Sequence, residues 1–312
     1  MLDKKLSDLF SEVSSRAALS SYYQIGKKDK IAADKAAVDS MRSELNKIDM
    51  NGRIVIGEGE LDEAPMLYIG EELGSKNGPS LDIAVDPLEG TNLVANNMPG
   101  GLSVIAIAEK NNLFGAPETY MDKISSNVSE TGVTDLDFSI KKNIHNLSEY
   151  KNKKPEDLTV CILDRPRHKD IIDDLKKLKV NLKLISDGDV SGALLVTDKK
   201  YGVDLFLGIG GGPEGVLAAS ALDAFDCNFQ GRFLFDTESE KSRALKMGIK
   251  DFKKKYELKE IVTGDSIFCA TGITAGDITS GIEIINSEFI SETLITHKSL
   301  GLKKIIKKKQ II

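Results

Sequence analysis

The chain has 312 residues, of which 41% are hydrophobic and 29% charged, and its formal net charge is −6. These values are typical of globular proteins and exclude an intrinsically disordered or fibrous chain, while the negative charge argues against a nucleic-acid partner. No apolar run reaches the length of a membrane span, and the first residues lack the apolar region of a signal peptide. We therefore expect a cytoplasmic protein with no membrane partner.

Cysteine and histidine are too sparse to dominate the chemistry. Cys161, Cys227 and Cys269 lie far apart in apolar or strand-like sequence, which favours reduced core thiols over a disulfide framework or a zinc site. There are only three histidines, so acidic residues are the more numerous catalytic candidates. The lysine-rich segment 303–309 is expected to be a solvated end.

Two amphipathic helices are expected in the first 48 residues, one over residues 1–25 and one from about Asp29 to Ile48. In the second helix Asp34 falls on a predicted apolar stripe formed by Ile31, Val38, Met41 and Leu45. An acid on such a face needs a partner. Neutralisation by Lys30, one turn away, and coordination of a metal ion are both open.

Two predicted strands end in acidic segments. Residues 52–56 lead into Gly57-Glu58-Gly59-Glu60, where the glycines allow close backbone approach to a ligand; a solvated acidic loop is the alternative. Residues 80–86 predict a buried strand that stops at Asp86, because Pro87 has no N–H for a central ladder.

The residues after Asp86 allow two interpretations. Asp-Pro followed by Gly is common turn chemistry. Alternatively, Asp86 and Glu89 hold hard cations, and the Gly90 and Thr91 amides receive a phosphate at a helix start that the Thr91 hydroxyl can cap.

The middle of the chain carries a weaker pattern. Residues 102–108 predict a strand, and Tyr120-Met121-Asp122-Lys123 is a possible substrate patch. The Lys/Asn-rich stretch 141–154 is expected to be a solvated connection or a domain boundary. We therefore predict an N-terminal half over 1–155 and a C-terminal half over 156–312.

Strands and helices alternate from residue 158 onward. Predicted strands at 158–163, 180–185 and 203–207 each precede a polar loop and a helix, which indicates a largely parallel or mixed sheet with ligands at the carboxyl ends of its strands. The loop Gly208–Gly215 is neither a Walker loop nor a dinucleotide fingerprint. A helix over about 237–247 and strands over 266–274 and 290–297 are expected to follow.

The candidate residues suit phosphate-ester hydrolysis. Arg165 and Arg167, two apart across a proline, would project to one side of an extended segment and grip a phosphate. Glu214 lies at the start of a predicted helix, where the helix dipole favours a carboxylate even if it has no function. An all-oxygen ligand set prefers Mg²⁺ or Mn²⁺, and the candidate carboxylates are Asp34, Glu58, Asp86, Glu89 and Glu214.

On these motifs the chain resembles the class II fructose-1,6-bisphosphatases, members of the lithium-sensitive, metal-dependent sugar-phosphatase superfamily. The motifs that carry the resemblance are Gly57–Glu60, Asp86–Thr91, Tyr120–Lys123, Asp164–Arg167, Asp187–Asp189 and Gly208–Gly215. The resemblance implies an α/β fold layered α-β-α-β-α, with two mixed sheets and the active site between the two halves. The sequence has no Trp, and Pro213-Glu214 takes the place of the superfamily's Trp-Asp pair, which argues against an inositol monophosphatase.

The resemblance also implies roles for individual residues. Mn²⁺ or Mg²⁺ would bind Asp34, Glu58, Asp86, Glu89, Glu214 and the Leu88 backbone carbonyl. Thr91 would position or activate the attacking water, with Asp62 assisting and Glu58 also catalytic. The implied substrate contacts are Glu89, Gly90, Thr91, Tyr120, Arg165, Pro166, Arg167, Asp187, Gly188, Asp189 and Gly211.

The implied activity is hydrolysis of the 1-phosphate of fructose 1,6-bisphosphate by a homodimer or homotetramer that takes part in gluconeogenesis. A sedoheptulose-1,7-bisphosphatase or a dual sugar bisphosphatase is the enzyme alternative. A phosphosugar-binding regulator without turnover is the non-enzyme alternative, and the retention of all five carboxylates speaks against it.

Overall fold

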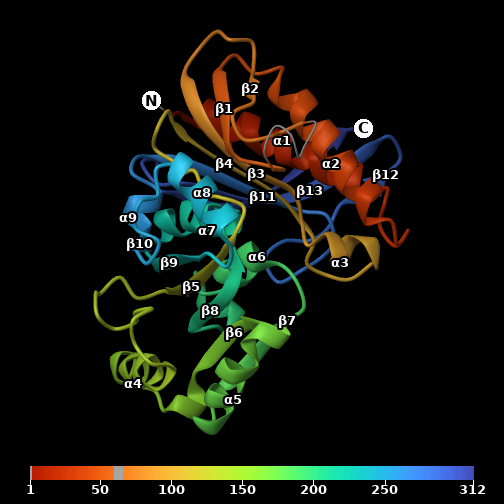
Figure 1. The fold of residues 1–312 in the computed structure, drawn as a ribbon. Helices are drawn as coiled ribbons and strands as arrows, with labels where there is room; N and C mark the ends of the chain where they lie inside the picture. The colour runs from red at the N-terminus through yellow and green to blue at the C-terminus, as the bar shows by residue number, and fades with distance from the viewer. Residues whose placement is uncertain (1, 60–65) are drawn as a thin grey trace. The chain divides into compact units, whose positions relative to one another are not determined.

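The computed structural model describes residues 2–59 and 66–312. The chain forms two compact units, one of Met1–Gly115 with Val262–Ile312 and one of Ala116–Ile261 (Figure 1). Among the described residues each unit contains one mixed sheet, so the predicted α/β class with two mixed sheets is confirmed. The units differ from the predicted halves 1–155 and 156–312, because β11 (Ser266–Gly272) returns to pair with β4 (Leu102–Glu109).

The first unit begins with the two expected helices, α1 (Lys4–Tyr22) and α2 (Lys30–Leu45). The carboxylates of Asp3 and Asp29 cap them by accepting backbone N–H groups three residues later, each at 2.9 Å. The predicted apolar stripe of α2 was wrong at Ile31, which is 82% exposed. The face that is buried instead carries Ala33, Ala37, Val38, Met41 and Leu45.

The sheet of the first unit has the strand order β12-β13-β11-β4-β3-β1-β2, and β14 also pairs with β13, off this path. Only β1 and β3 run parallel among its described pairs. The segment 303–309 is not a solvated end as predicted, because β14 pairs with β13 along its whole length. The remaining bounds are β1 (Asn51–Ile56), β2 (Glu72–Leu73), β3 (Ser80–Glu89), β12 (Glu283–Ile285), β13 (Glu288–His297), β14 (Leu302–Ile311) and α3 (Thr91–Ala95).

The sheet of the second unit has the strand order β10-β9-β5-β8-β6-β7. As the strand and helix alternation predicts, β6, β7 and β8 run parallel, whereas β5 and β9 are antiparallel to their neighbours. The bounds are β5 (Tyr120–Ser126), β6 (Thr159–Leu163), β7 (Asn181–Ile185), β8 (Leu205–Gly211), β9 (Asn228–Leu234), β10 (Lys255–Glu257), α5 (Lys169–Lys177), α6 (Asp189–Leu194), α7 (Gly212–Leu222), α8 (Glu238–Lys246) and α9 (Leu258–Ile261).

The stretch 141–154 is not a solvated connection, because most of it forms α4 (Ile140–Lys151). Ser139 caps the helix by accepting the Lys142 N–H at 3.2 Å, and Asn152 ends it in the left-handed conformation. Ile144 and Leu147 are buried in the core of the second unit. This apolar face is narrow, so the polar composition of the stretch concealed it.

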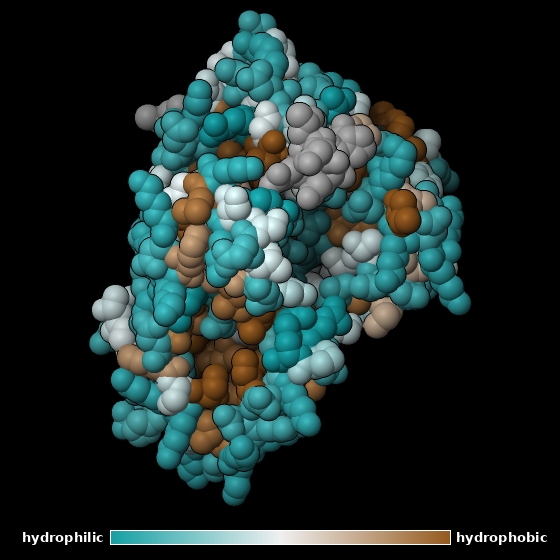
Figure 2. All heavy atoms as spheres, viewed as in Figure 1, coloured by the Kyte–Doolittle hydropathy of each residue, from teal (hydrophilic) through white to brown (hydrophobic). Residues whose placement is uncertain are grey.

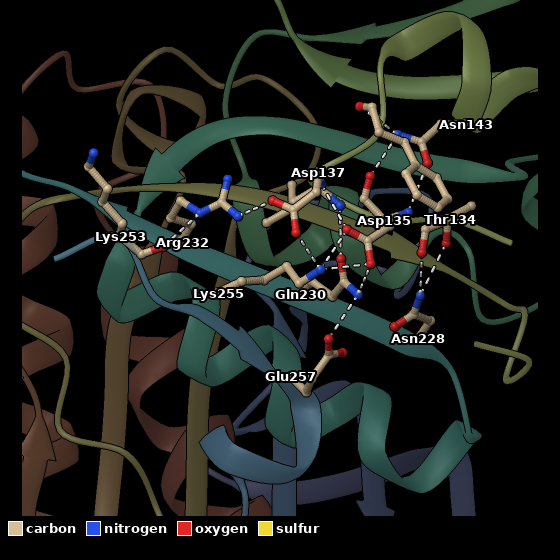
Figure 3. A network of polar contacts seen from close by, with 12 residues as sticks. Thr134, Asp135, Asp137, Asn143, Asn228, Gln230, Arg232, Lys253, Lys255 and Glu257 are labelled. Carbon is tan, nitrogen blue, oxygen red and sulfur yellow. Dashed lines mark hydrogen bonds and ion pairs between the residues drawn. The ribbon is translucent and has the colours of Figure 1, made fainter. Parts of the chain in front are cut away.

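A polar network fixes the segment that precedes α4 (Figure 3). Lys255 donates to Asp135 at 2.6 and 2.7 Å and to Asp137 at 2.8 Å, and Arg232 also pairs with Asp137. Gln230 donates to Asp135 at 3.2 Å and accepts the Leu136 N–H at 2.9 Å. We call these residues the Asp135–Lys255 clasp. It ties the segment to β9 and β10.

Other expectations from composition can be compared with the structure. All three cysteines are buried thiols, which confirms their prediction as core thiols. No helix within 2–59 or 66–312 is long and apolar enough to cross a membrane. The viewed surface is mostly hydrophilic, with apolar side chains gathered in its lower half over the second unit (Figure 2).

Candidate active site

The acidic motif of the first unit lies on a bulged strand. β3 does not stop at Asp86 as predicted, but continues to Glu89. Asp86 is opposite Val104 and Glu89 opposite Leu102, so three steps along β3 match two along β4. A bulge leaves a residue without ladder bonds, which is why Pro87 is tolerated there. The bulge redirects the strand just where the two carboxylates occur.

The turn after Glu89 depends on glycine. Gly90 has φ of 80° and precedes the short helix α3. The Thr91 hydroxyl does not cap this helix as predicted, but donates to the Leu88 carbonyl at 3.2 Å. The Leu88 N–H in turn bonds Asp86 Oδ1 at 3.1 Å. Local bonds therefore order three residues of the predicted catalytic motif, and the Leu88 carbonyl keeps a second lone pair.

Asp34 is a half-buried carboxylate on α2. Burial raises its pKa above the ordinary value. Neither Lys30 nor any other residue in the described parts of the chain forms a hydrogen bond or ion pair with the Asp34 carboxylate, so the first alternative left open by the sequence is not observed. An isolated carboxylate of this kind can accept a cation at little cost in broken contacts.

Glu58 follows β1 and is also half-buried. Its backbone N–H bonds the Leu67 carbonyl at 2.9 Å, which fixes the turn. The predicted catalytic Asp62 lies outside the described residues. Its assisting role therefore stays a prediction.

In the second unit the candidate residues follow the carboxyl ends of the parallel strands, as the sequence predicts. Arg165 follows β6, Asp187 follows β7, and Gly211 ends β8. The stretch from Gly208 was predicted as a loop, but β8 runs through it to Gly211, and α7 begins at Gly212. The glycines are therefore part of a strand–helix junction, not of a free loop.

The two arginines do not share one side of an extended segment, because Pro166–His168 forms a turn of 3₁₀ helix. Arg165 pairs with Asp187 at 3.4 Å. Arg167 donates from Nε to the Ile209 carbonyl at 2.9 Å, and its guanidinium lies 4.8 Å from the centre of the Tyr120 ring. Each arginine is therefore ordered by separate neighbours.

His168 connects β6 to β8 through hydrogen bonds of its ring. Its Nδ1 lies 2.7 Å from the Leu163 carbonyl, and its Nε2 accepts the Ile209 N–H at 2.8 Å. Because Nε2 accepts, the proton lies on Nδ1 and the ring is neutral, and burial lowers its pKa. Gly208, at φ of 139°, lets β8 pass close to the ring. His168 therefore has a structural role.

Lys123 is a residue of this site whose role the sequence analysis missed. It is 1% exposed, and it donates to Asp189 and, at 2.7 Å, to the Gly211 carbonyl. The other carboxylate oxygen of Asp189, Oδ1, is buried without a hydrogen-bond partner among the described residues. The available signal was the period of two that places Lys123 on the same buried face of β5 as Met121 and Ser125.

Two successive glycines make room for carboxylates. A Cβ on Gly210 would lie 1.9 Å from Asp189 Oδ2, and one on Gly211 would lie 1.8 Å from Glu214 Oε2. Burial raises the pKa of Glu214; the Lys123 charge opposes this rise and the Asp189 charge adds to it. The second unit therefore concentrates negative charge at the junction of β8 and α7, with one buried ammonium as compensation.

The five predicted metal carboxylates are divided between the units. Asp34, Glu58, Asp86 and Glu89 belong to the first and Glu214 to the second. No cluster of three or more His, Cys, Asp or Glu side chains suited to a metal occurs within the described ranges 2–59 and 66–312. Whether the five carboxylates meet around metal ions stays a prediction.

Comparison with known proteins supplies the class. The family model described as "Bacterial fructose-1,6-bisphosphatase, glpX-encoded" matches residues 4–310. "D-fructose 1,6-bisphosphatase class 2/sedoheptulose 1,7-bisphosphatase" of Synechocystis sp. is 40% identical over 94% of this chain and 92% of that protein. The protein of the same name from Trichodesmium erythraeum is 39% identical over 91% and 90%.

Solved structures give a more distant likeness. The extragenic suppressor protein suhB from Bartonella henselae is 13% identical, with a TM-score of 0.37 over 63% of this chain and 73% of that one. The inositol monophosphatase from Anabaena is 14% identical, with a TM-score of 0.33 over 62% and 71%.

The match over residues 4–310 defines the chain as a sugar-bisphosphate phosphatase. It belongs to the glpX-encoded, class II family of bacterial fructose-1,6-bisphosphatases. The resemblance noted from the sequence motifs is thereby confirmed.

Proposed function

We propose that this chain hydrolyses the 1-phosphate of fructose 1,6-bisphosphate to fructose 6-phosphate and phosphate. The observation that carries the proposal is the family match over residues 4–310. The sequence also contains every carboxylate that the resemblance implies as a metal ligand. Turnover needs these five carboxylates, whereas a regulator that only binds a phosphosugar would not need them. They are Asp34, Glu58, Asp86, Glu89 and Glu214.

The donor set fits a hard divalent cation, because it consists of carboxylates and one backbone carbonyl. We propose that Asp34, Glu58, Asp86, Glu89, Glu214 and the Leu88 carbonyl hold Mn²⁺ or Mg²⁺. When bound, the ion would neutralise phosphate charge and lower the pKa of a water. The unpartnered state of Asp34 among the described residues supports this assignment.

The remaining residues would position the reactants. Since the Thr91 hydroxyl donates its proton to the Leu88 carbonyl, its oxygen is left to accept a hydrogen bond from the attacking water, with Asp62 assisting. Arg165 and Arg167 would bind phosphate through guanidinium donors, and Tyr120 would hold Arg167 in place.

The acids of the second unit would bind the sugar. Asp189 Oδ1 is buried and has no hydrogen-bond partner among the described residues, so a sugar hydroxyl that donates to it would relieve an unsatisfied acceptor. Phosphate would be repelled there. We assign Asp187, Gly188 and Asp189 to the polyol and Gly211 to close backbone approach.

A dual activity on sedoheptulose 1,7-bisphosphate is the second candidate, because the relatives carry both activities in their names. Phosphate release should be measured on both bisphosphates with Mn²⁺, Mg²⁺ or chelator, in the wild type and in Asp86→Asn. Loss of release in the variant, with unchanged unfolding, is expected. Full activity of Asp86→Asn, or release that chelator does not reduce, would contradict the metal-dependent mechanism.

The resemblance also implies a homodimer or homotetramer. Sedimentation velocity measures this oligomeric state.

A further inference from the structure

A cavity lies within the second unit, at the opposite ends of the strands that carry the candidate site. Its volume is about 520 Å³, which is in the range of small-molecule sites. Its lining includes Thr159, the first residue of β6, and Asp204, which immediately precedes β8. Arg165 and Gly211 follow or end the same strands at their carboxyl ends. A strand of five residues is about 16 Å long, so the two places are distinct.

Part of the lining of this cavity is a cluster of charged side chains joined by hydrogen bonds. Asp204 is 6% exposed and accepts Lys151 Nζ at 2.8 Å, Lys153 Nζ at 2.9 Å and the Thr159 N–H at 3.0 Å. One carboxylate therefore orders two ammonium groups. Each ammonium has three donors, so donors remain after Asp204 is satisfied. Because both side chains are already positioned, a ligand would bind them at a reduced entropic cost.

A third lysine and an aromatic ring complete the lining. Lys199 is exposed, and its ammonium forms no hydrogen bond or ion pair with the described part of the chain. Tyr150 is 49% exposed and offers a flat surface for an uncharged group. Three lysines face two aspartates here, Asp157 and Asp204, so the cavity is positive although the whole chain carries −6. We call the cavity lined by these three lysines, two aspartates and Tyr150 the lysine cavity.

We propose that the lysine cavity binds a small organic phosphate monoester at a site separate from the active site. A phosphate dianion matches two adjacent ammonium groups and a third that has no partner of its own. One phosphate dianion changes the net charge of the lining from +1 to −1, whereas a second dianion would change it to −3 beside Asp157 and Asp204. A monoester is therefore favoured over a bisphosphate, and the remaining volume accommodates its organic part against Tyr150. Occupancy here would give the unit an effector site that does not compete with substrate.

The test is to measure the binding of glycerol 3-phosphate to the full chain by isothermal titration calorimetry at constant ionic strength. Lys199→Gln breaks no side-chain hydrogen bond or ion pair with any described residue, and its matched control is Lys176→Gln, which removes one exposed charge on α5. We expect Lys199→Gln to weaken binding at least fivefold, combination with Lys153→Gln to abolish it, and Lys176→Gln to leave it unchanged.

Saturating fructose 1,6-bisphosphate should leave this binding in place, which separates the lysine cavity from the active site. Complete displacement by the bisphosphate would overturn the proposal, as would equal losses in Lys199→Gln and Lys176→Gln or unaltered binding in the double variant. Because binding is measured without turnover, the result does not depend on the proposed phosphatase activity.

Discussion

The buried ammonium of Lys123 donates to Asp189, whose carboxylate occupies the space that a side chain at residue 210 would fill. One carboxylate oxygen is thereby held by β5, and the other is left without a partner among the described residues. Asp189 is thus ordered before any ligand arrives. The free-energy cost of burying the Asp189 carboxylate depends on Lys123, because a buried carboxylate is tolerated only with a compensating charge.

Lys123→Met should lower the free energy of unfolding by about 3 kcal/mol, since it leaves Asp189 as an uncompensated buried charge. The double variant Lys123→Met/Asp189→Asn should recover more than half of that loss, because it removes both charges. Urea unfolding of the four proteins in this cycle measures the coupling. If the two changes prove additive, the pair does not interact as described.

Gly210→Ala should raise the KM for the sugar bisphosphate at least tenfold, because its Cβ would lie 1.9 Å from Asp189 Oδ2 and displace the carboxylate. The control is Gly248→Ala. Gly248 has φ of 90° and no neighbour within 4 Å of an added Cβ, so alanine there costs about 1 kcal/mol of backbone strain without touching the site. Steady-state kinetics and thermal unfolding of both variants separate the two effects. An unchanged KM in Gly210→Ala would show that Asp189 is not needed in this position.

The sequence predicted elements whose patterns are local and missed those set by distant partners. The two N-terminal helices and the β6–β7–β8 units have clear periodicity and were found. The glycines at 208–211 suggested a loop, but pairing with Tyr120–Lys123 on β5 makes them a strand. The lysines of β14 suggested a solvated end, but ten register pairs with β13 order them.

The same limit applies to the candidate site. The motif carboxylates and arginines could be named from the sequence, because the motifs are contiguous. Lys123 could not be assigned a role, because its partners Asp189 and Gly211 are 66 and 88 residues away. The arginines were assigned an extended geometry that the 3₁₀ turn at Pro166 does not allow.

The Asp135–Lys255 clasp should make stability depend on pH. Burial would raise the pKa of Asp135, but its hydrogen bonds, chiefly the one from Lys255, lower this pKa overall. Hydrogen bonds from Lys255 and Arg232 lower the pKa of Asp137. A carboxyl whose pKa is lower in the folded than in the unfolded chain stabilises the folded state at pH values above the unfolded pKa, which is about 3.9 for Asp. This contribution to the free energy of unfolding is lost as the pH falls through the folded pKa. Lys255→Met should cost about 2 kcal/mol at pH 7 and progressively less below pH 4. Urea unfolding from pH 3 to 7 measures this, and a constant difference between the proteins would contradict it.

Asp34→Asn should stabilise the metal-free chain while abolishing phosphatase activity. Burial raises the pKa of Asp34 without an opposing charge, so the ionised carboxylate destabilises the folded state at pH 7. Replacing it with the isosteric amide should raise the free energy of unfolding in chelator by about 1 kcal/mol. Asp39→Asn on the same helix is the matched control. It removes an exposed pair with Lys35 at 3.0 Å and should cost only a few tenths of a kcal/mol, with activity kept. Loss of stability in Asp34→Asn would mean that the carboxylate has a structural partner, whereas retained activity would remove Asp34 from the metal ligands.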